Sequence, residues 1–336
     1  MSENLLSRGH SVRIYCHSPL FENKPKYVNG ISLIYMPTIQ SKKLSQLTNS
    51  FFSFIHFCFS KYDIVFAVNS ANGPFGLLTK IFRKKSCINT DGLEWLRPKW
   101  KGIGAIYFNI ASKLSTLFFD KIITDSDEMR NVYIKKYKTD SEIICYGPTI
   151  VESNHKKLIN YDLKKDSYYL IVGRLIPDNN GLLIVKGFLN SKTKRKLVIV
   201  GDVPYKDKYA ESFKKINDPR IIFTGYIVDP AELSALYSNC YVYIHGHEYG
   251  GTNPTMINAL SINSFILALS TKFNKEMLEN YNNFLLFDKD INSISNTINT
   301  IDNSVNKQSS YSLPKKYLWK NIVDKYEAVF YSLLNK

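Results

Sequence analysis

Long hydrophobic runs are missing from this 336-residue sequence. No stretch of 18 apolar residues occurs, and the longest candidate is the aromatic segment Phe51–Phe59. Such a segment is too short to span a bilayer as a helix. The first eight residues also lack the apolar core of a secretory signal peptide. We therefore expect neither a transmembrane helix nor a cleaved leader.

Cysteine is scarce and scattered. The five cysteines are odd in number and no two are spaced as Cys-x-x-Cys; they are Cys16, Cys58, Cys87, Cys145 and Cys240. This arrangement favours neither a disulfide framework nor a zinc site. The sequence thus predicts a reduced, cytoplasmic protein.

Acidic residues are too few to balance the basic ones. Lys and Arg number 44 against 29 Asp and Glu, which gives a net charge of +15. Such an excess favours an acidic partner: nucleic acid, anionic lipid or a phosphorylated substrate. A basic surface that binds only water is the alternative. Zinc-finger and RNA-recognition motifs are absent, and basic residues do not alternate with aromatic ones, so we expect no nucleic-acid partner.

Apolar strands alternate with helices in two successive sets. Strands are predicted at 11–16, 31–36, 63–68, 86–90, 121–124 and 143–146, and again at 168–172, 196–200, 221–224 and 241–245. This order predicts an α/β fold with right-handed crossovers and parallel sheets. The polar stretch 151–167 predicts a linker. We therefore expect one domain over 1–150, a second over 168–312, and a final amphipathic helix within 313–336.

A glycine turn joins the strand at 241–245 to a helix. Gly250 and Gly251 have no Cβ, so the backbone can turn there and approach a ligand closely. Asn253 followed by Pro254 is typical of a helix N-cap and first position. We expect free N–H groups and the positive end of the helix dipole to face the loop, which predicts an anion site.

A second polar segment, residues 91–100, follows the strand at 86–90. The carboxyl ends of parallel strands are where open α/β sheets bind ligands. This segment combines carboxylates, indole rings and cations, namely Asp91, Glu94, Trp95, Arg97 and Trp100. Such a mixture at the end of a strand is unlike an ordinary connection. The alternative is that Trp95 and Trp100 only cover the core.

Five motifs carry a family resemblance, and they occur in the family's order. They are Asn89–Trp95, Val172–Asn180, Gly201–Tyr209, Pro219–Gly225 and His245–Pro254. The sequence resembles the family 4 retaining glycosyltransferases over residues 8–331, and within them the bacterial surface-polysaccharide rhamnosyltransferases. The resemblance implies a GT-B fold. This fold has two Rossmann-like domains facing a cleft, an acceptor-side first domain, a donor-side second domain and a last helix that packs back on the first.

The resemblance also implies the chemistry and the site. A sugar would pass from a nucleoside diphosphate to an acceptor with retention of configuration, and neither a metal nor another cofactor is expected. The diphosphate leaving group needs fixed positive charge, which Arg174 would supply as a bidentate cation together with the helix start at 251–255. The expected donor-binding residues are Gly173, Arg174, Asn179, Asn180, His245, Gly250, Gly251, Thr252, Asn253 and Asn258.

The expected catalytic residues are Arg174, His247 and Asp91. His245 and His247 are candidates for a general base, because imidazole titrates near neutral pH. Because the leaving phosphate can take the acceptor's proton, we instead expect one histidine to hydrogen-bond to sugar or phosphate and the other to support it. The expected acceptor-binding residues are Asp91, Glu94, Trp95 and Arg97.

Two departures from the family pattern affect these expectations. Relatives carry glutamates where this chain has Gly250 and Asn258. Asn258 can still donate and accept hydrogen bonds but carries no charge, so we expect weaker binding of the sugar donor. Glu248 either takes over the role of the missing glutamate or is an exposed loop carboxylate. The chain also begins inside the first helix, so we expect the first domain to lack its first strand and glycine loop.

The leading prediction is a transferase of L-rhamnose from dTDP-rhamnose to a lipid-linked saccharide, in capsular or other surface polysaccharide synthesis at the inner membrane face. Phe51–Phe59, with Lys42, Lys43, Lys61 and Arg83–Lys85, would contact anionic lipid, unless those aromatics are core. An impaired protein that only binds a nucleotide sugar or a partner enzyme is the main alternative. A nucleotide-sugar epimerase is a third possibility.

Overall fold

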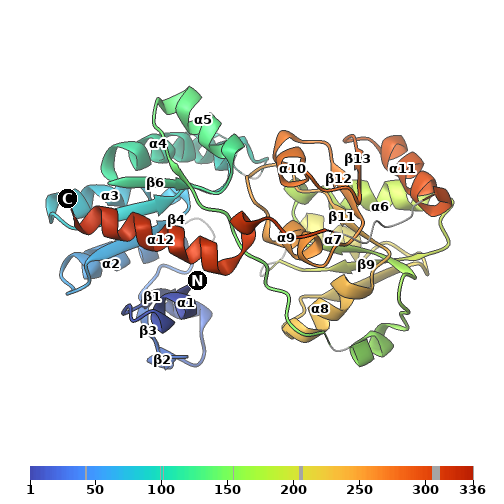
Figure 1. Ribbon diagram of the computed structural model, residues 1–336, viewed down its shortest axis with the longest axis horizontal. Coiled ribbons are helices and arrows are strands. Elements are labelled where there is room, and N and C mark those ends of the chain that lie inside the picture. The colour runs from blue at the N-terminus through green and yellow to red at the C-terminus, as the bar shows by residue number, and fades with distance from the viewer. Residues whose placement is uncertain are drawn as a thin grey trace. The chain divides into compact units, whose positions relative to one another are not determined.

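The computed structural model describes residues 1–41, 44–98, 100, 102–153, 155–203, 207–304 and 311–335. The chain divides into two compact units (Figure 1). Unit 1 comprises Met1–Leu96, Trp100–Cys145 and Trp319–Lys336, and unit 2 comprises Arg97–Lys99 and Tyr146–Leu318. Lys42 and Lys43 of the predicted lipid patch, and residues 204–206 of the third motif, lie outside the described residues. Within the described ranges, no helix has the length and apolar character that crossing a membrane requires.

Unit 1 contains two sheets. The first has the order β1-β3-β2, and the second has the parallel order β4-β5-β6-β7. The strands are β1 (Arg13–His17), β2 (Tyr27–Val28), β3 (Ile31–Met36), β4 (Ile64–Val68), β5 (Lys85–Asn89), β6 (Lys121–Thr124) and β7 (Glu142–Ile143). The helices are α1 (Ser2–Ser7), α2 (Ser45–Cys58), α3 (Gly76–Ile81), α4 (Ile103–Phe118), α5 (Asp127–Tyr137) and α12 (Trp319–Leu334).

Two details of unit 1 differ from the sequence predictions. The β2–β3 pair is antiparallel, because Asn29 and Gly30 join the strands in a turn with positive φ at both residues. The apolar run of β4 predicts a buried strand, but most of its residues are half-buried and Val68 is 47% exposed. Its described pairing is with β5 alone.

The last helix, α12, packs in unit 1. Its buried stripe includes Ile322, Tyr326 and Val329, spaced three or four residues apart, and joins a cluster with Cys87 and Ile123 of the second sheet. This spacing puts the apolar side chains on one helix face. Polar contacts add to the packing, since Glu327 pairs with both Arg8 and His10.

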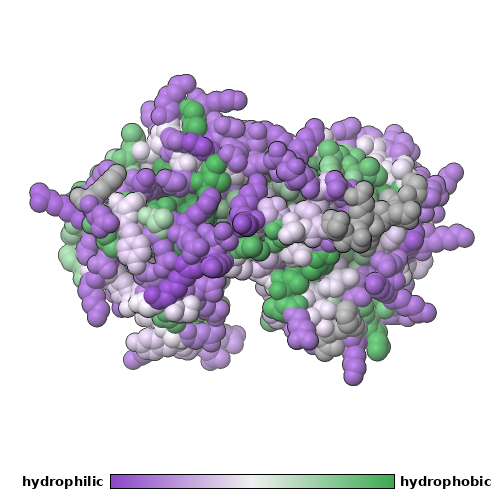
Figure 2. All heavy atoms as spheres, in the orientation of Figure 1, coloured by the Kyte–Doolittle hydropathy of each residue, from purple (hydrophilic) through white to green (hydrophobic). Residues whose placement is uncertain are grey.

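Unit 2 is built on one parallel sheet of six strands, in the order β10-β9-β8-β11-β12-β13. The strands are β8 (Tyr168–Val172), β9 (Lys196–Val200), β10 (Ile221–Gly225), β11 (Val242–His245), β12 (Ile266–Leu269) and β13 (Phe284–Phe287). The helices are α6 (Gly181–Asn190), α7 (Lys208–Phe213), α8 (Pro230–Asn239), α9 (Pro254–Ser261), α10 (Lys272–Met277) and α11 (Ile291–Ser304). The face drawn in Figure 2 is mostly hydrophilic with scattered apolar patches, in keeping with the net charge of +15.

Alternate residues of this sheet face different helices. Tyr169 and Ile171 point into a core with Ile184 and Phe188 of α6. Tyr168 points to the other face, where its hydroxyl donates to the carbonyl of Leu236 in α8 at 2.7 Å. Because both faces are covered, the central strands are apolar almost throughout.

The strand order changes direction between β8 and β11. The chain proceeds from β8 outward to β9 and β10, and later from β11 outward to β12 and β13. Neighbouring connections therefore diverge at the carboxyl ends of β8 and β11, which leaves a crevice there. This point fixes where unit 2 can hold a ligand.

The predicted linker, residues 151–167, is folded onto unit 2. It contains a 3₁₀ helix at His155–Tyr161. The Tyr161 hydroxyl donates to Glu232 at 2.6 Å, and Leu158 and Leu163 are buried.

Candidate functional site

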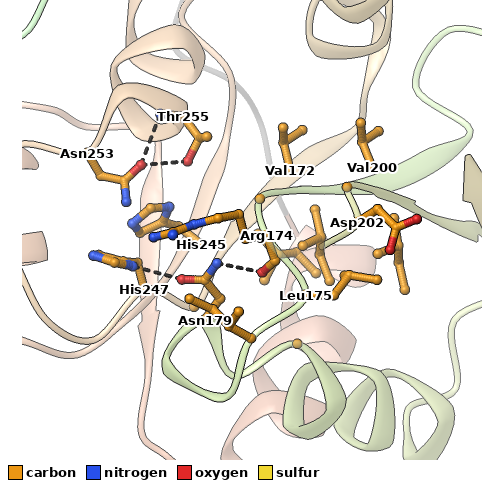
Figure 3. A pocket seen from close by; sticks show the side chains of 18 of the residues that line it. Val172, Arg174, Leu175, Asn179, Val200, Asp202, His245, His247, Asn253 and Thr255 are labelled. Carbon is orange, nitrogen blue, oxygen red and sulfur yellow. Dashed lines mark hydrogen bonds between the residues drawn. The ribbon is translucent and has the colours of Figure 1, made fainter. Parts of the chain in front are cut away.

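A cavity of about 370 Å³ lies at the carboxyl ends of β8, β9 and β11, where the strand order changes (Figure 3). The start of α9 forms another part of its wall. All of its lining residues belong to unit 2. The expected donor-binding residues that line it are Gly173, Arg174, Asn179, His245 and Asn253, together with the expected catalytic residue His247.

Glycine is required where β8 and β9 end. Gly201 has φ +141°, and a Cβ at this position would lie 1.9 Å from the carbonyl oxygen of Gly173. No side chain fits that distance. The two motif glycines therefore let the strand ends approach each other and leave room for the cavity.

Arg174 brings an exposed positive charge to the cavity. Its side chain extends across the cavity toward His245 and Asn253 in Figure 3. The residue is exposed, and no carboxylate of the described residues lies within ion-pair distance of its guanidinium. Its planar fork is thus available to an anionic group of a ligand.

Asn179 links Arg174 to His247. The Asn179 Nδ2 donates to the carbonyl of Arg174 at 2.8 Å, and its Oδ1 lies 2.8 Å from His247 Nδ1. With Nδ2 used as a donor, Oδ1 accepts, so His247 donates from Nδ1. The side chain of Asn179 therefore fixes one tautomer of His247.

His247 is uncharged at neutral pH. Burial, together with the nearby cations Arg97 and Arg174, lowers the pKa of His247 to about 3. A group with so low a pKa is a poor general base at pH 7. This result favours the expectation that His247 hydrogen-bonds or supports its neighbours.

The start of α9 differs from the sequence prediction. Asn253 is the N-cap and Pro254 occupies the first turn, as expected. However, Thr255 N–H donates to the Asn253 side chain, and the Met256 and Ile257 N–H groups donate to the Asn253 carbonyl. The prediction of free first-turn N–H groups is therefore wrong, because the cap residue satisfies them itself.

Two features at the start of α9 can still interact with an anion: the helix dipole and the loop before the helix. A helix dipole contributes about 0.3 to 1 kcal/mol to an anion at its start. The N–H groups of Gly250 and Gly251 have no hydrogen-bond acceptor among the described residues. Arg174 is thus the exposed cation among the described residues that line the cavity, whereas Gly250 and Gly251 lie in the loop before α9 and outside that lining.

Three other expected donor-binding residues are buried within unit 2. Asn258 is buried and exchanges hydrogen bonds with Thr149: its Oδ1 accepts from Thr149 N–H at 2.7 Å, and its Nδ2 donates to the Thr149 hydroxyl at 3.1 Å. Asn180 is also buried and donates to the carbonyl of Gly246 at 2.9 Å. Thr252 is buried as well. Asn258 therefore anchors a distant segment, and its side chain faces a protein partner.

Glu248 is held by its neighbours. Its carboxylate accepts from Lys289 Nζ at 2.6 Å and from Asn180 Nδ2 at 3.3 Å, and its side chain is 19% exposed. Of the two interpretations from sequence, the exposed loop carboxylate does not fit these contacts. Glu248 stabilises the loop after β11.

Arg97 and Asp178 form a buried pair that sequence reasoning missed. Arg97 was expected to bind the acceptor, but it belongs to unit 2. Its Nη1 lies 3.8 Å from Asp178 Oδ2, and its Nη2 donates to the carbonyl of Tyr249 at 3.4 Å. The side chains are 8% and 0% exposed. Asp178 lies inside the motif Val172–Asn180, but nothing local identified its partner.

The other expected acceptor residues lie in unit 1. Asp91 follows β5 and is half-buried. Glu94 is buried and accepts from Trp100 Nε1 at 2.7 Å. The Trp95 ring is covered by Lys136 Nζ, 3.9 Å from its centroid. Glu94 and Trp95 thus have protein partners within unit 1.

Gly246 offers a test of how tightly the loop after β11 packs. A Cβ at Gly246 would lie 2.4 Å from the carbonyl oxygen of Asn179 and 2.6 Å from the Ile184 side chain. We expect Gly246→Ala to displace the turn that carries Asn179 and to cost about 1 to 3 kcal/mol. Thermal unfolding should show a lower midpoint, and nucleoside diphosphate affinity should fall. An unchanged midpoint would contradict this packing.

Two family models and several known proteins are similar to this chain. The family model of the group 1 glycosyl transferases matches residues 153–312, and a domain of unknown function, DUF1972, matches residues 60–149. An uncharacterized glycosyltransferase of Methanocaldococcus jannaschii is 27% identical over 220 residues, which cover 59% of this chain and 52% of that protein.

A second relative has a name that states its activity. It is the Campylobacter jejuni N-acetylgalactosamine-N,N'-diacetylbacillosaminyl-diphospho-undecaprenol 4-alpha-N-acetylgalactosaminyltransferase, 25% identical over 147 residues, which cover 44% of this chain and 39% of that protein. The chain spans about half the length, or less, of these two curated relatives.

Solved structures show the same fold. The sucrose-phosphate synthase of Thermosynechococcus elongatus matches with a TM-score of 0.79 at 16% identity, over 99% of this chain and 92% of that chain. Anabaena HepE in complex with UDP and glucose matches with a TM-score of 0.71 at 14% identity, over 91% and 87%. The fold is GT-B, and the comparisons support the group 1 glycosyltransferase class for this chain.

Proposed function

We propose that the protein is a glycosyltransferase that moves a sugar from a nucleoside diphosphate to a saccharide acceptor carried on a lipid. The cavity at the change of strand order, with Arg174 free to meet a diphosphate, is the observation that carries the proposal. The match of residues 153–312 to group 1 glycosyl transferases supports it. The diphospho-undecaprenol acceptor in the name of the Campylobacter relative supports the lipid carrier.

In the proposed reaction, the bond between the sugar C1 and the diphosphate oxygen breaks while the acceptor oxygen bonds to C1 from the same face. The proton of the acceptor hydroxyl passes to the departing phosphate oxygen. Arg174 and the amides of Gly250 and Gly251 stabilise the negative charge that develops there. We propose that this chemistry needs no metal.

The finer proposal is L-rhamnose from dTDP-rhamnose, with retention, in surface polysaccharide synthesis. It rests on the resemblance of the five motifs described above. The experiment is to incubate the purified protein with dTDP-, UDP- and GDP-sugars and to measure release of the nucleoside diphosphate with and without lipid-linked saccharide. Turnover of one nucleotide class, stimulated by the acceptor, is expected; release from none of them contradicts the proposed transferase.

A second candidate function is a binding protein without catalysis. It is favoured by one observation: the Asn258 side chain is committed to Thr149. This function would give no release in that experiment, whereas a titration with the same nucleotide sugars would show binding.

Asp91 is the residue proposed to bind the acceptor and to act in catalysis. We expect Asp91→Asn to lower turnover roughly 10- to 100-fold, because a hydrogen bond to a charged group contributes about 1.5 to 3 kcal/mol. Nucleoside diphosphate affinity should stay within twofold of the wild type. Asp63→Asn, at another residue of unit 1, serves as the control. An equal loss of nucleotide affinity would contradict the acceptor role.

An anionic membrane surface is a further proposed partner. Of the aromatic segment, Phe54 and Phe57 are buried, whereas Phe51, Phe52 and Phe59 are 42%, 40% and 76% exposed. The interpretation of these aromatics as core therefore holds only for part of the segment. Exposed rings beside the basic residues Lys61 and Arg83 suit an interfacial contact.

Vesicle flotation tests this contact. We expect the protein to float with vesicles that contain phosphatidylglycerol at low salt and to remain unbound with phosphatidylcholine alone, because the basic residues need anionic headgroups. Replacing Phe51 and Phe59 with serine should weaken the binding. Equal recovery with both kinds of vesicle would contradict the proposed surface.

A further inference from the structure

His245 is a buried polar side chain in the wall of the cavity. It is 3% exposed and lines the cavity at the end of β11. Its Nε2 has no hydrogen-bond partner among the residues that the structure describes, and it has less than 1 Å² of exposed surface. A buried polar atom without a partner is costly and calls for an explanation. The other ring nitrogen, Nδ1, lies 3.0 Å from the Tyr243 hydroxyl.

A chain of hydrogen bonds fixes which nitrogen of His245 carries the proton. It begins at the Thr255 N–H, which lies 3.0 Å from the side-chain atom Asn253 Oδ1. Because an N–H group can only donate, Asn253 Oδ1 must be the acceptor. The Thr255 hydroxyl also donates to Asn253 Oδ1, at 2.8 Å. The Thr255 hydroxyl has only one hydrogen, so it must accept at its other contact.

That other contact is the Tyr243 hydroxyl, which donates to the Thr255 hydroxyl at 2.8 Å. The single hydrogen of Tyr243 is then used, so Tyr243 must accept from His245. His245 therefore carries its proton on Nδ1. Its Nε2 keeps a lone pair and can only accept a hydrogen bond.

Burial and the neighbouring His247 lower the pKa of His245 well below its usual value. The ring thus stays neutral at physiological pH, and Nε2 remains an acceptor. Phosphate oxygens at neutral pH are acceptors too. A phosphate therefore finds no partner at Nε2, whereas a hydroxyl or an amide N–H does.

We propose that His245 is a specificity-determining residue that accepts a hydrogen bond from an O–H or N–H group on the sugar of the donor. This inference rests on the proposed function. In this proposal the diphosphate binds to Arg174 and the amides of Gly250 and Gly251, and the sugar donates a hydrogen bond to His245. Because Nε2 is covered, a side chain must turn aside when the ligand binds. Arg174, which extends toward His245 in Figure 3, is the side chain that moves to the diphosphate.

The tautomer is measured directly by NMR of the protein labelled with ¹⁵N at histidine side chains. The His245 signals, assigned by their absence in His245→Gln, should show a protonated Nδ1 and an unprotonated Nε2. In Tyr243→Phe, which removes the acceptor of Nδ1–H, the Nε2–H form should appear. A wild-type protein protonated at Nε2 would overturn the proposal.

Binding measures the contribution of the sugar. The probes are UDP, UDP-glucose, dTDP and dTDP-rhamnose, and the quantity is the ratio of the diphosphate Kd to the sugar-nucleotide Kd. We expect His245→Phe to reduce this ratio roughly tenfold, as the loss of one hydrogen bond at a buried site predicts, with the diphosphate Kd unchanged. His245→Gln retains an acceptor oxygen and should keep most of the ratio. His56→Phe, at an exposed histidine of unit 1, is the matched control.

The outcomes separate the two proposals. If neither diphosphates nor sugar nucleotides bind the wild type, the proposed function fails while the tautomer measurement still stands. If both bind and His245→Phe leaves the ratio unchanged, the role of His245 is overturned and the proposed function survives. A parallel loss of diphosphate affinity would place the phosphate at His245 and also overturn the role.

Discussion

Replacing Arg174 with methionine is expected to lower the rate of sugar transfer roughly 10²- to 10³-fold, about 3 to 4 kcal/mol of transition-state stabilisation. The guanidinium is an exposed charge in the cavity wall. The α9 dipole contributes much less because Asn253 already satisfies the first-turn amides. No protein ion pair of the described residues is lost with it, so the folded state should be unaffected. Initial rates of nucleoside diphosphate release measure the effect.

Arg174→Lys separates the effect of the charge from that of the planar guanidinium. It retains the charge but loses the planar fork, so we expect an intermediate rate. Arg83→Met removes an exposed cation of unit 1 and serves as the matched control for total charge. If Arg174→Met transfers sugar as fast as the wild type, the diphosphate does not depend on Arg174.

Replacing Arg97 with methionine is expected to destabilise unit 2 by about 3 to 5 kcal/mol. The substitution removes the cation that lies 3.8 Å from the carboxylate of Asp178, whose side chain is 0% exposed. Removing one partner of a buried ion pair is strongly destabilising. Urea denaturation, followed by hydrogen exchange of amides in β8 and β11, reports on this unit.

The double substitution Arg97→Met with Asp178→Asn removes both charges and should recover part of the loss. Lys196→Met is the matched control in the same unit, since its pair with Asp162 is 31% and 95% exposed and should contribute less than about 1 kcal/mol. Equal effects for Lys196→Met and Arg97→Met would contradict the view that burial gives the Arg97 pair its importance.

Much of unit 2 could be predicted from sequence because its elements follow from local patterns. The observed bounds of β8 and β9 are the predicted ones, and α9 begins at Pro254 with Asn253 as its cap. In unit 1, β3 also has its predicted bounds. These predictions depend on the spacing of apolar residues, on glycines and on cap residues. Such features act over a few positions, so the sequence reveals them without knowledge of tertiary contacts.

The partners of the site residues could not be predicted in the same way. Asn258 bonds to Thr149 across 109 residues, and Arg97 reaches Tyr249 across 152. Such contacts depend on how distant segments are brought together, which periodicity does not report. The free amides at the start of α9 were predicted wrongly for a local reason, since the Asn253 side chain and carbonyl compete for them.

An amide NMR titration of the ¹⁵N-labelled protein tests the central claim most directly. On addition of UDP or dTDP, the signals of the Gly250 and Gly251 amides and of Arg174 Nε should shift together and saturate. The matching nucleoside without phosphates should leave them in place. Shifts confined to other residues, or the same shifts with the nucleoside, would contradict a diphosphate site at the ends of β8 and β11.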